Sequence, residues 1–240
     1  MSAMRVLNDL SFRMVKAIIF WPKFSVTSFK MASDLVCQKV LPKTVIDVGA
    51  NVGQFAVASA KLFPNVLVHA FEPNPDCVVA LQKNVMSLGS VLVYHIALGE
   101  EEGEAAFHVN SHSHSSSILP LSRNHLEAFP DAREVNSIQV KVSTLDTIFS
   151  GMELSAPVLL KLDVQGYEAQ ALRGAVKTLE RIDYVVLETS FKPMYEGEML
   201  FMDIVRLMES YGFSFLRPVG WLNDPNTGEI VQMDALFQRN

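Results

Sequence analysis

The feature that most constrains the fold is an alternation of strand and helix patterns that begins at Thr44. Short β-branched or apolar runs occupy residues 44–50, 66–73 and 91–99, and a segment of helical periodicity follows each of the first two. The second of these helices opens with Asn74 and Pro75, a favoured N-cap and a favoured first helical residue. Short turns between such elements are required by a parallel sheet covered on both faces. The sequence therefore predicts a doubly wound α/β sheet.

Residues 100–157 interrupt this alternation. The stretches 104–110 and 137–146 read as two antiparallel strands, and the polar segment between them carries two prolines. A long loop inside a compact domain is usually a lid or a binding loop, so a hairpin and loop insertion is predicted here. Buried-strand patterns return at 157–166 and 184–190, a helix is predicted to end near Gly212, and two strands follow it.

Composition narrows the class of protein. With 240 residues, 49% hydrophobic and 19% charged, the chain suits one large α/β domain with an accessory segment, and bulk disorder is excluded. A net charge of −6 without any Lys/Arg block argues against nucleic acid as a partner. The two cysteines, Cys37 and Cys77, form no C-x-x-C pair, which favours a reducing, cytoplasmic location.

Residues 1–42 are predicted to form a helical extension, followed by the main domain over 43–240. Apolar residues recur at helical spacing at Val6, Leu10, Met14, Ala17 and Ile18. We expect this helix to pack on the domain or to cover a cleft. The apolar run is too short to cross a bilayer and no signal cleavage site follows it, so peripheral membrane contact is the lesser alternative. The oligomeric state is open.

The glycine turn after the first strand indicates a ligand site. Ligands bind at the carboxyl ends of strands in doubly wound sheets, and Gly49 and Gly53 are expected to let one approach the backbone. Glu72 ends the second strand, where a carboxylate can accept both hydroxyl hydrogens of a ribose. Asp47 would repel a pyrophosphate but suits an ammonium or sulfonium group, which favours S-adenosylmethionine. Asn51 stands where a dinucleotide fingerprint has its second glycine, which weakens an NAD-type oxidoreductase as the alternative. The alternative to a ligand site is a glycine turn and a strand-end acid that bind no ligand.

Seven motifs occur in an order that resembles FkbM-type methyltransferases over about residues 43–239. They read VIDVGANVGQF, HAFEPNP, IALG, VKVSTLD, LLKLDVQGYEAQALRGA, VVLETS and DALF. The resemblance implies a class I methyltransferase (Rossmann-like) fold with seven strands, the last antiparallel. It also implies S-adenosylmethionine as methyl donor and a hydroxyl of a sugar, glycan or secondary metabolite as acceptor. With the residue reasoning above, it assigns cofactor contacts to Asp47, Gly49, Ala50, Asn51, Gly53, Phe55, Glu72, Pro73, Asn74, Ser117 and Asp163.

One position departs from the family pattern. Members usually read Asp-Val-Glu-Gly where this chain has Gln165 between Val164 and Gly166. A glutamine hydrogen-bonds but carries no charge and accepts no proton. A module that binds the cofactor without turnover is therefore a further alternative.

Four residues are candidates for catalysis. Asp163 follows a buried strand on the cofactor side, where it can orient the acceptor, take its proton, hold an ammonium group, or simply cap a helix. Lys161 shares its face, and Glu188 ends the neighbouring strand. His114 lies in the polar loop and is a second candidate base. No metal is predicted, because no Asp, Glu or Cys completes a site with His112 and His114. Substrate-facing residues are expected mainly on loops 108–136 and 190–200.

Overall fold

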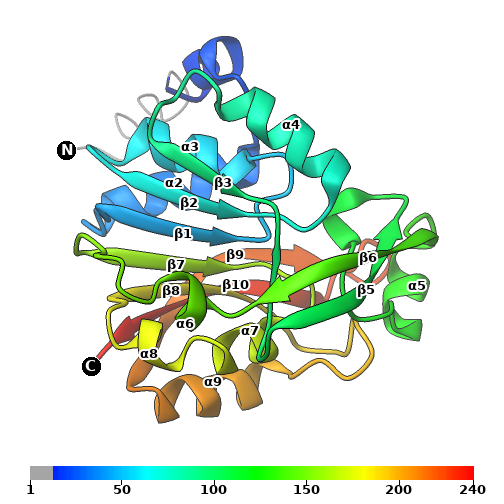
Figure 1. Cartoon of the computed structure of the whole chain (residues 1–240). Helices are drawn as coiled ribbons and strands as arrows, with labels where there is room; N and C mark the ends of the chain where they lie inside the picture. Colours follow the sequence, from blue (N-terminus) through cyan, green and yellow to red (C-terminus); the bar gives the residue numbers. More distant parts are fainter. Residues whose placement is uncertain (1–12) are drawn as a thin grey trace.

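The computed structural model describes residues 13–240 and is built around one seven-stranded sheet (Figure 1). The strand order is β3-β2-β1-β7-β8-β10-β9. The strands span Val91–Tyr94 (β3), Leu67–Phe71 (β2), Thr44–Val48 (β1), Val158–Leu162 (β7), Tyr184–Ser190 (β8), Ile230–Arg239 (β10) and Phe213–Asn223 (β9). β10 runs antiparallel to both β8 and β9, while β1, β2, β3, β7 and β8 are mutually parallel. This confirms the predicted class I sheet with an antiparallel last strand.

Helices cover both faces of this sheet. One face carries α2 (Val26–Cys37), α3 (Gln54–Leu62) and α4 (Pro75–Val85), and the other carries α6 (Leu145–Ile148), α7 (Glu168–Arg173), α8 (Val176–Leu179) and α9 (Phe201–Ser210) (Figure 1). Because both faces are covered, every residue of β1 and of β7 is buried. Asn74 caps α4, as predicted, and accepts a hydrogen bond from the backbone N–H of Asp76.

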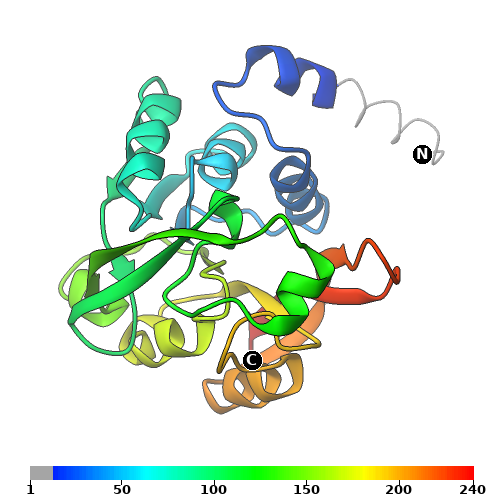
Figure 2. The same cartoon turned by 90° about the vertical axis from the view of Figure 1, so that its right-hand side faces the viewer.

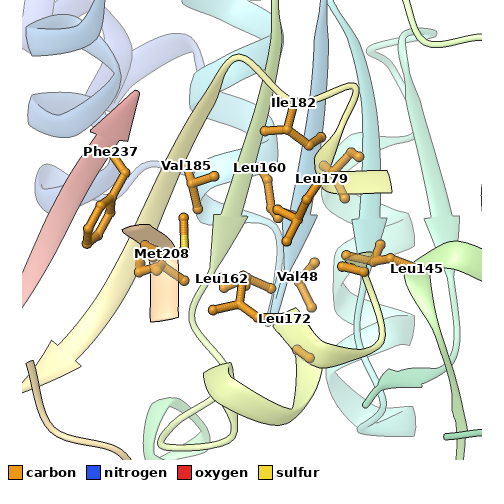
Figure 3. Close-up of a cluster of buried hydrophobic side chains, with 14 of the residues drawn as sticks. Val48, Leu145, Leu160, Leu162, Leu172, Leu179, Ile182, Val185, Met208 and Phe237 are labelled. Atoms are coloured by element: carbon orange, nitrogen blue, oxygen red, sulfur yellow. The ribbon is translucent and has the colours of Figure 1, made fainter. Parts of the chain in front are cut away.

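Strand alternation decides which side chains reach each face. Val45 and Leu159 point toward α2, α3 and α4, whereas Leu160 and Leu162 pack with the helices opposite (Figure 3). Asp47 and Lys161 therefore lie on the α2 side, in the same register row of the sheet. The polar residues of these two strands are thus placed together by period-two geometry.

The insertion is more ordered than the sequence indicated. β5 (Gly103–Asn110) and β6 (Glu134–Ser143) pair antiparallel, as expected, and β4 (Ala97–Leu98) extends them into a small sheet. The stretch between β5 and β6 contains η1 (Ser113–Ser115) and α5 (Arg123–Ala128) rather than one irregular loop. Figures 1 and 2 show these elements beyond the carboxyl ends of the parallel strands, where a ligand of the main sheet would bind.

The described part of the N-terminal extension, residues 13–42, contains two helical stretches. Residues 13–20 are helical, and Val6 and Leu10 of the predicted helix lie outside the described residues. α2 lies within the predicted helical extension, although the sequence analysis gave it no bounds of its own; it packs on α3 and buries Ala32 and Leu35 in the core of the main sheet. The division at residues 42 and 43 stays a prediction. Within residues 13–240, no helix has both the length and the hydropathy needed to cross a bilayer.

Candidate active site

A cavity of about 800 Å³ opens at the carboxyl ends of the parallel strands. Most of the predicted site residues line it: Asp47, Gly49, Ala50, Asn51, Phe55, Glu72, Pro73, His114, Lys161, Asp163 and Glu188. Three predicted cofactor contacts, Gly53, Asn74 and Ser117, do not line it. Ser117 instead donates a hydrogen bond to the backbone carbonyl of Gln165 at 2.7 Å, which ties the insertion to the loop after β7.

The two glycines of the turn make room for neighbouring parts of the protein. Gly49 has φ +82°, and a Cβ there would lie 1.9 Å from the carbonyl oxygen of Asp163. Gly53 has φ +93°, and a Cβ there would lie 2.7 Å from Cδ1 of Leu81 on α4. The sequence analysis expected these positions to admit a ligand. The structure shows that they allow the loops after β1 and β7, and helices α3 and α4, to approach closely.

Glu72, which was predicted to bind a ribose, also stabilises the glycine turn. Its Oε2 accepts from the backbone N–H of Asn51 and its Oε1 from that of Asn74, both at 2.8 Å. The carboxyl is buried, and burial raises its pKa to about 7 against the opposing effect of the two N–H donors. Each oxygen retains a second acceptor site, so the carboxylate can still bind two hydroxyls.

Asp47 is a buried carboxylate without the donors that usually accompany one. Its exposure is 0%, and neither oxygen accepts a hydrogen bond of normal geometry. The nearest cation is the Lys161 ammonium, whose Nζ lies 3.8 Å from Oδ1. Burial raises the pKa of Asp47 to about 6 and nearby Asp163 adds to the increase, whereas Lys161 opposes it. An orphaned carboxylate in a cavity wall calls for a donor or a positive charge from a ligand.

The neutral amide of Gln165 lies between two carboxylates. Its Nε2 donates to Oδ1 of Asp163 and to Oε2 of Glu188, both at 2.7 Å, while its Oε1 accepts from the Tyr195 hydroxyl at 2.5 Å. Lys161 donates to the other oxygen of Asp163 at 3.0 Å. A glutamate at position 165 would place a third negative charge here. The glutamine that departs from the family pattern therefore donates hydrogen bonds to both carboxylates and links them.

The two bridged carboxyls differ in their affinity for a proton. Burial tends to raise the pKa of Asp163, but the Lys161 charge and the Gln165 amide outweigh burial and lower it. Burial, together with the charges of Asp163 and Asp234, raises the pKa of Glu188 well above its ordinary value. Asp163 is therefore the more readily ionised of the two carboxyls, and Glu188 is the more readily protonated.

The sequence analysis missed the far wall of the cavity. Asp234 of β10 lies opposite Glu188 in register and also lines the cavity, and burial raises its pKa to about 6. Gln232 donates to Oε2 of Glu188 at 3.2 Å. The available signal was the pair of polar residues alternating with apolar ones in the last strand. The rim is formed by residues of α2 and of the β9–β10 hairpin, including Ser25, Ser28, Met31, Trp221 and Asn226.

Two expectations about loops have different outcomes. Residues 112–116 and 128–132 of the insertion line the cavity, as predicted. Residues 190–200 do not, so that part of the prediction is wrong. Tyr195 from this loop is fully buried beneath Gly166 and supports Gln165 from behind. Within the part of the chain that the structure describes, no group of three or more His, Cys, Asp or Glu side chains has the arrangement of a metal site.

Comparison with known proteins identifies a family and several relatives of this chain. The model of the methyltransferase FkbM domain matches residues 47–215. The 2-O-methyltransferase NoeI of Sinorhizobium fredii is 27% identical over 192 residues, covering 77% of this chain and 79% of the relative. The 31-O-demethyl-FK506 methyltransferase FkbM of Streptomyces tacrolimicus is 26% identical over 193 residues, covering 71% of this chain and 72% of that relative. The hexuronic acid methyltransferase AglP of Haloferax volcanii is 28% identical over 144 residues, with 59% and 54% covered.

A solved structure agrees at the level of the fold. The methyltransferase FkbM from Methylobacillus flagellatus superposes with a TM-score of 0.50 at 14% identity. The alignment covers 82% of this chain and 43% of that one, so this chain spans less than half of its length. The comparisons confirm the predicted family, fold class and enzyme class, and with them S-adenosylmethionine as methyl donor. The family match extends over more than half of the sequence, and the chain belongs to the FkbM methyltransferase family.

Proposed function

We propose that this protein transfers a methyl group from S-adenosylmethionine to a hydroxyl oxygen of a saccharide or of a sugar-like metabolite. The observation that carries the proposal is the pair of buried acids at the base of the cavity. Glu72 has free acceptor sites for two hydroxyls, and Asp47 is a buried carboxylate that accepts no hydrogen bond of normal geometry and lies 3.8 Å from the Lys161 ammonium. The names of three relatives specify a 2-O-methylation, a hexuronic acid substrate and a 31-O-demethyl substrate. These names support the transfer of the methyl group to an oxygen atom.

The residues present fit this methyl donor. Glu72 would accept the two ribose hydroxyls, and Asp47 would attract the positively charged amino-acid end, which restores the partner that its carboxylate lacks. Ala50, Asn51 and Phe55 line the space between these acids. The bound cofactor supplies an activated methyl group on a sulfonium centre, so the protein needs chiefly to position the acceptor and accept its proton.

Glu188 is the proposed proton acceptor, and Asp163 is a positioning residue. Asp163 is held by Lys161 and Gln165 with both oxygens occupied, and its lowered pKa makes it a weak base. Glu188 faces the cavity with a raised pKa, which strengthens it as a base once it is ionised. His114 is exposed at the opening, where it offers a second route for the proton to solvent.

The proposed acceptor enters past α2, α5 and the β9–β10 hairpin. Trp221 is 64% exposed at this rim, and an indole face next to hydroxyl-binding groups suits a pyranose ring. A cytoplasmic location is also proposed, from two free thiols at Cys37 and Cys77. The oligomeric state is not assigned.

The direct test is calorimetry with S-adenosylhomocysteine. The wild type is expected to bind, and Glu72→Gln is expected to bind about 10- to 100-fold more weakly, because one charged hydrogen bond of about 1.5–3 kcal/mol is lost. Glu198→Gln is the matched control, since Glu198 accepts bonds from Ser190, Met194 and Tyr195 outside the cavity. Absence of any heat or thermal shift for the wild type would overturn the proposal. Label transfer to hydroxyl-bearing sugars, and not to amines, then tests the acceptor class.

A further inference from the structure

A group of large apolar side chains is exposed near the described N-terminus. Val15, Ile18, Ile19, Phe20 and Val26 face solvent, with Phe20 exposed by 73% and Ile19 by 65%. We name this group the N-terminal patch. Most of it lies on the helix of residues 13–20, which stands at the top of both Figure 1 and Figure 2, at the outer edge of the molecule. Large apolar side chains that gather on one surface mark a binding site.

The orientation of this helix is fixed by the side that it buries. Ala17 is 1% exposed, and the following Trp21 packs against Phe24 and Phe29. The Trp21 backbone N–H also donates to the Ala17 carbonyl at 3.0 Å, so the chain continues directly from the helix into this aromatic cluster. The contacts turn the small residue inward and leave Ile18, Ile19 and Phe20 outward.

The segment that carries the patch has a charge of opposite sign to that of the whole protein. Residues 13–33 contain four basic side chains, Arg13, Lys16, Lys23 and Lys30, and no acidic one, although the net charge of the chain is −6. Basic residues flanking exposed apolar residues are the pattern of a segment that lies in the interface of an anionic membrane. We propose that residues 13–26 dock the protein on an anionic lipid bilayer.

A second copy of the chain fits the same surface less well. In a two-fold dimer the patch would meet itself, and the four basic side chains of each copy would be brought toward those of the other. Anionic headgroups instead complement this charge while the acyl region takes up the apolar side chains. The described helix is also too short to cross the bilayer, so the contact is peripheral.

The position of the patch relates it to the cavity. Ser25, Thr27, Ser28 and Met31, which adjoin the patch along the chain, line the cavity. Docking therefore brings the opening of the cavity to the headgroup layer. This placement suits an acceptor saccharide that is carried on a lipid. The inference about the acceptor rests on the proposed function, whereas the inference of membrane binding does not.

The test is sedimentation of the full chain with vesicles, without cofactor or acceptor. The wild type is expected to pellet with phosphatidylcholine vesicles that contain 30% phosphatidylglycerol, and less so with phosphatidylcholine alone or in high salt. The double variant Ile19→Asp/Phe20→Asp is expected to bind at least tenfold more weakly. The matched control Val79→Asp/Met86→Asp changes residues 68% and 82% exposed near α4, and it is expected to pellet as the wild type does.

Three results would overturn the docking proposal. The first is a wild type that stays in solution with the anionic vesicles, and the second is equal binding by wild type and double variant. The third is a dimer in sedimentation velocity that the double variant loses while no protein binds vesicles, which assigns the patch to a second copy. Unchanged melting temperature and S-adenosylhomocysteine affinity of both variants verify folding. Because vesicle binding needs no turnover, its failure is distinguishable from failure of the proposed function.

Discussion

Replacing Asp47 by asparagine is expected to stabilise the ligand-free protein and to weaken cofactor binding. The pKa of the buried Asp47 carboxyl rises from its ordinary value of 3.8 to about 6 on folding. The folded protein therefore holds this proton more tightly than the unfolded chain, so stability falls as pH rises between these two values. This pKa difference of about two units lowers the free energy of unfolding by about 3 kcal/mol above pH 6 and by about half of that at pH 5.

Removing the charge removes this cost. Asp47→Asn should raise the melting temperature of the ligand-free protein by about 6–12 °C at pH 8, and by about half as much at pH 5, for a domain of this size. The same substitution should weaken S-adenosylhomocysteine binding at least tenfold, because the charge that attracts its ammonium group is lost. Thermal melts at the two pH values and calorimetry with S-adenosylhomocysteine measure these effects.

A matched control separates this effect from the loss of an ordinary buried acid. Asp146 accepts hydrogen bonds from the backbone N–H groups of Lys177 and Thr178 and from the Thr178 hydroxyl. Asp146→Asn should therefore lower the melting temperature. The reasoning is refuted if Asp47→Asn also lowers it at pH 8, or raises it equally at both pH values.

Two further predictions concern the bridged carboxylates. Gln165→Glu should lower the free energy of unfolding by about 2–4 kcal/mol at pH 8, because a third carboxylate replaces an amide that donates to Asp163 and Glu188. Most of this loss should disappear at pH 5. Denaturant melts at both pH values measure the effect, and an equal loss at both would contradict the like-charge argument. Glu188→Gln should slow single-turnover methyl transfer by about 10²-fold with little change in S-adenosylhomocysteine affinity. If the variant instead binds the cofactor weakly and keeps its transfer rate, Glu188 is a binding residue.

The sheet was predictable because its strands carry strong local signals. The predominantly apolar runs of β1, β2 and β7 are buried on both faces, apart from Leu67 at the start of β2, and such runs can be recognised in the sequence without knowledge of the neighbouring strands. The bounds of α2 were not predicted because its sequence, VTSFKMASDLVC, contains β-branched and hydroxyl residues that weaken helix propensity, and the helix depends on the Ser25 cap and on packing against α3. Local propensity does not report such tertiary support.

The site was predicted to the extent that its residues follow strands in the chain. Asp47, Glu72, Asp163 and Glu188 all end or follow parallel strands, so topology alone brings them to one edge of the sheet. The place of Asp234 beside Glu188 depends on the antiparallel register of β10, which no local pattern encodes. The close approach of Gly49 to the Asp163 carbonyl was equally hidden, because that carbonyl comes from a distant part of the sequence.

The place of β10 has a consequence for biosynthesis. Residues 230–239 are inserted between β8 and β9, so β9 has no sheet partner, and β8 keeps an open edge, until they have left the ribosome. An open edge beside a buried parallel sheet invites pairing with other chains. The nascent protein is therefore prone to aggregate until β10 has been made, and a fragment limited to the family match at 47–215 would retain this exposed edge permanently.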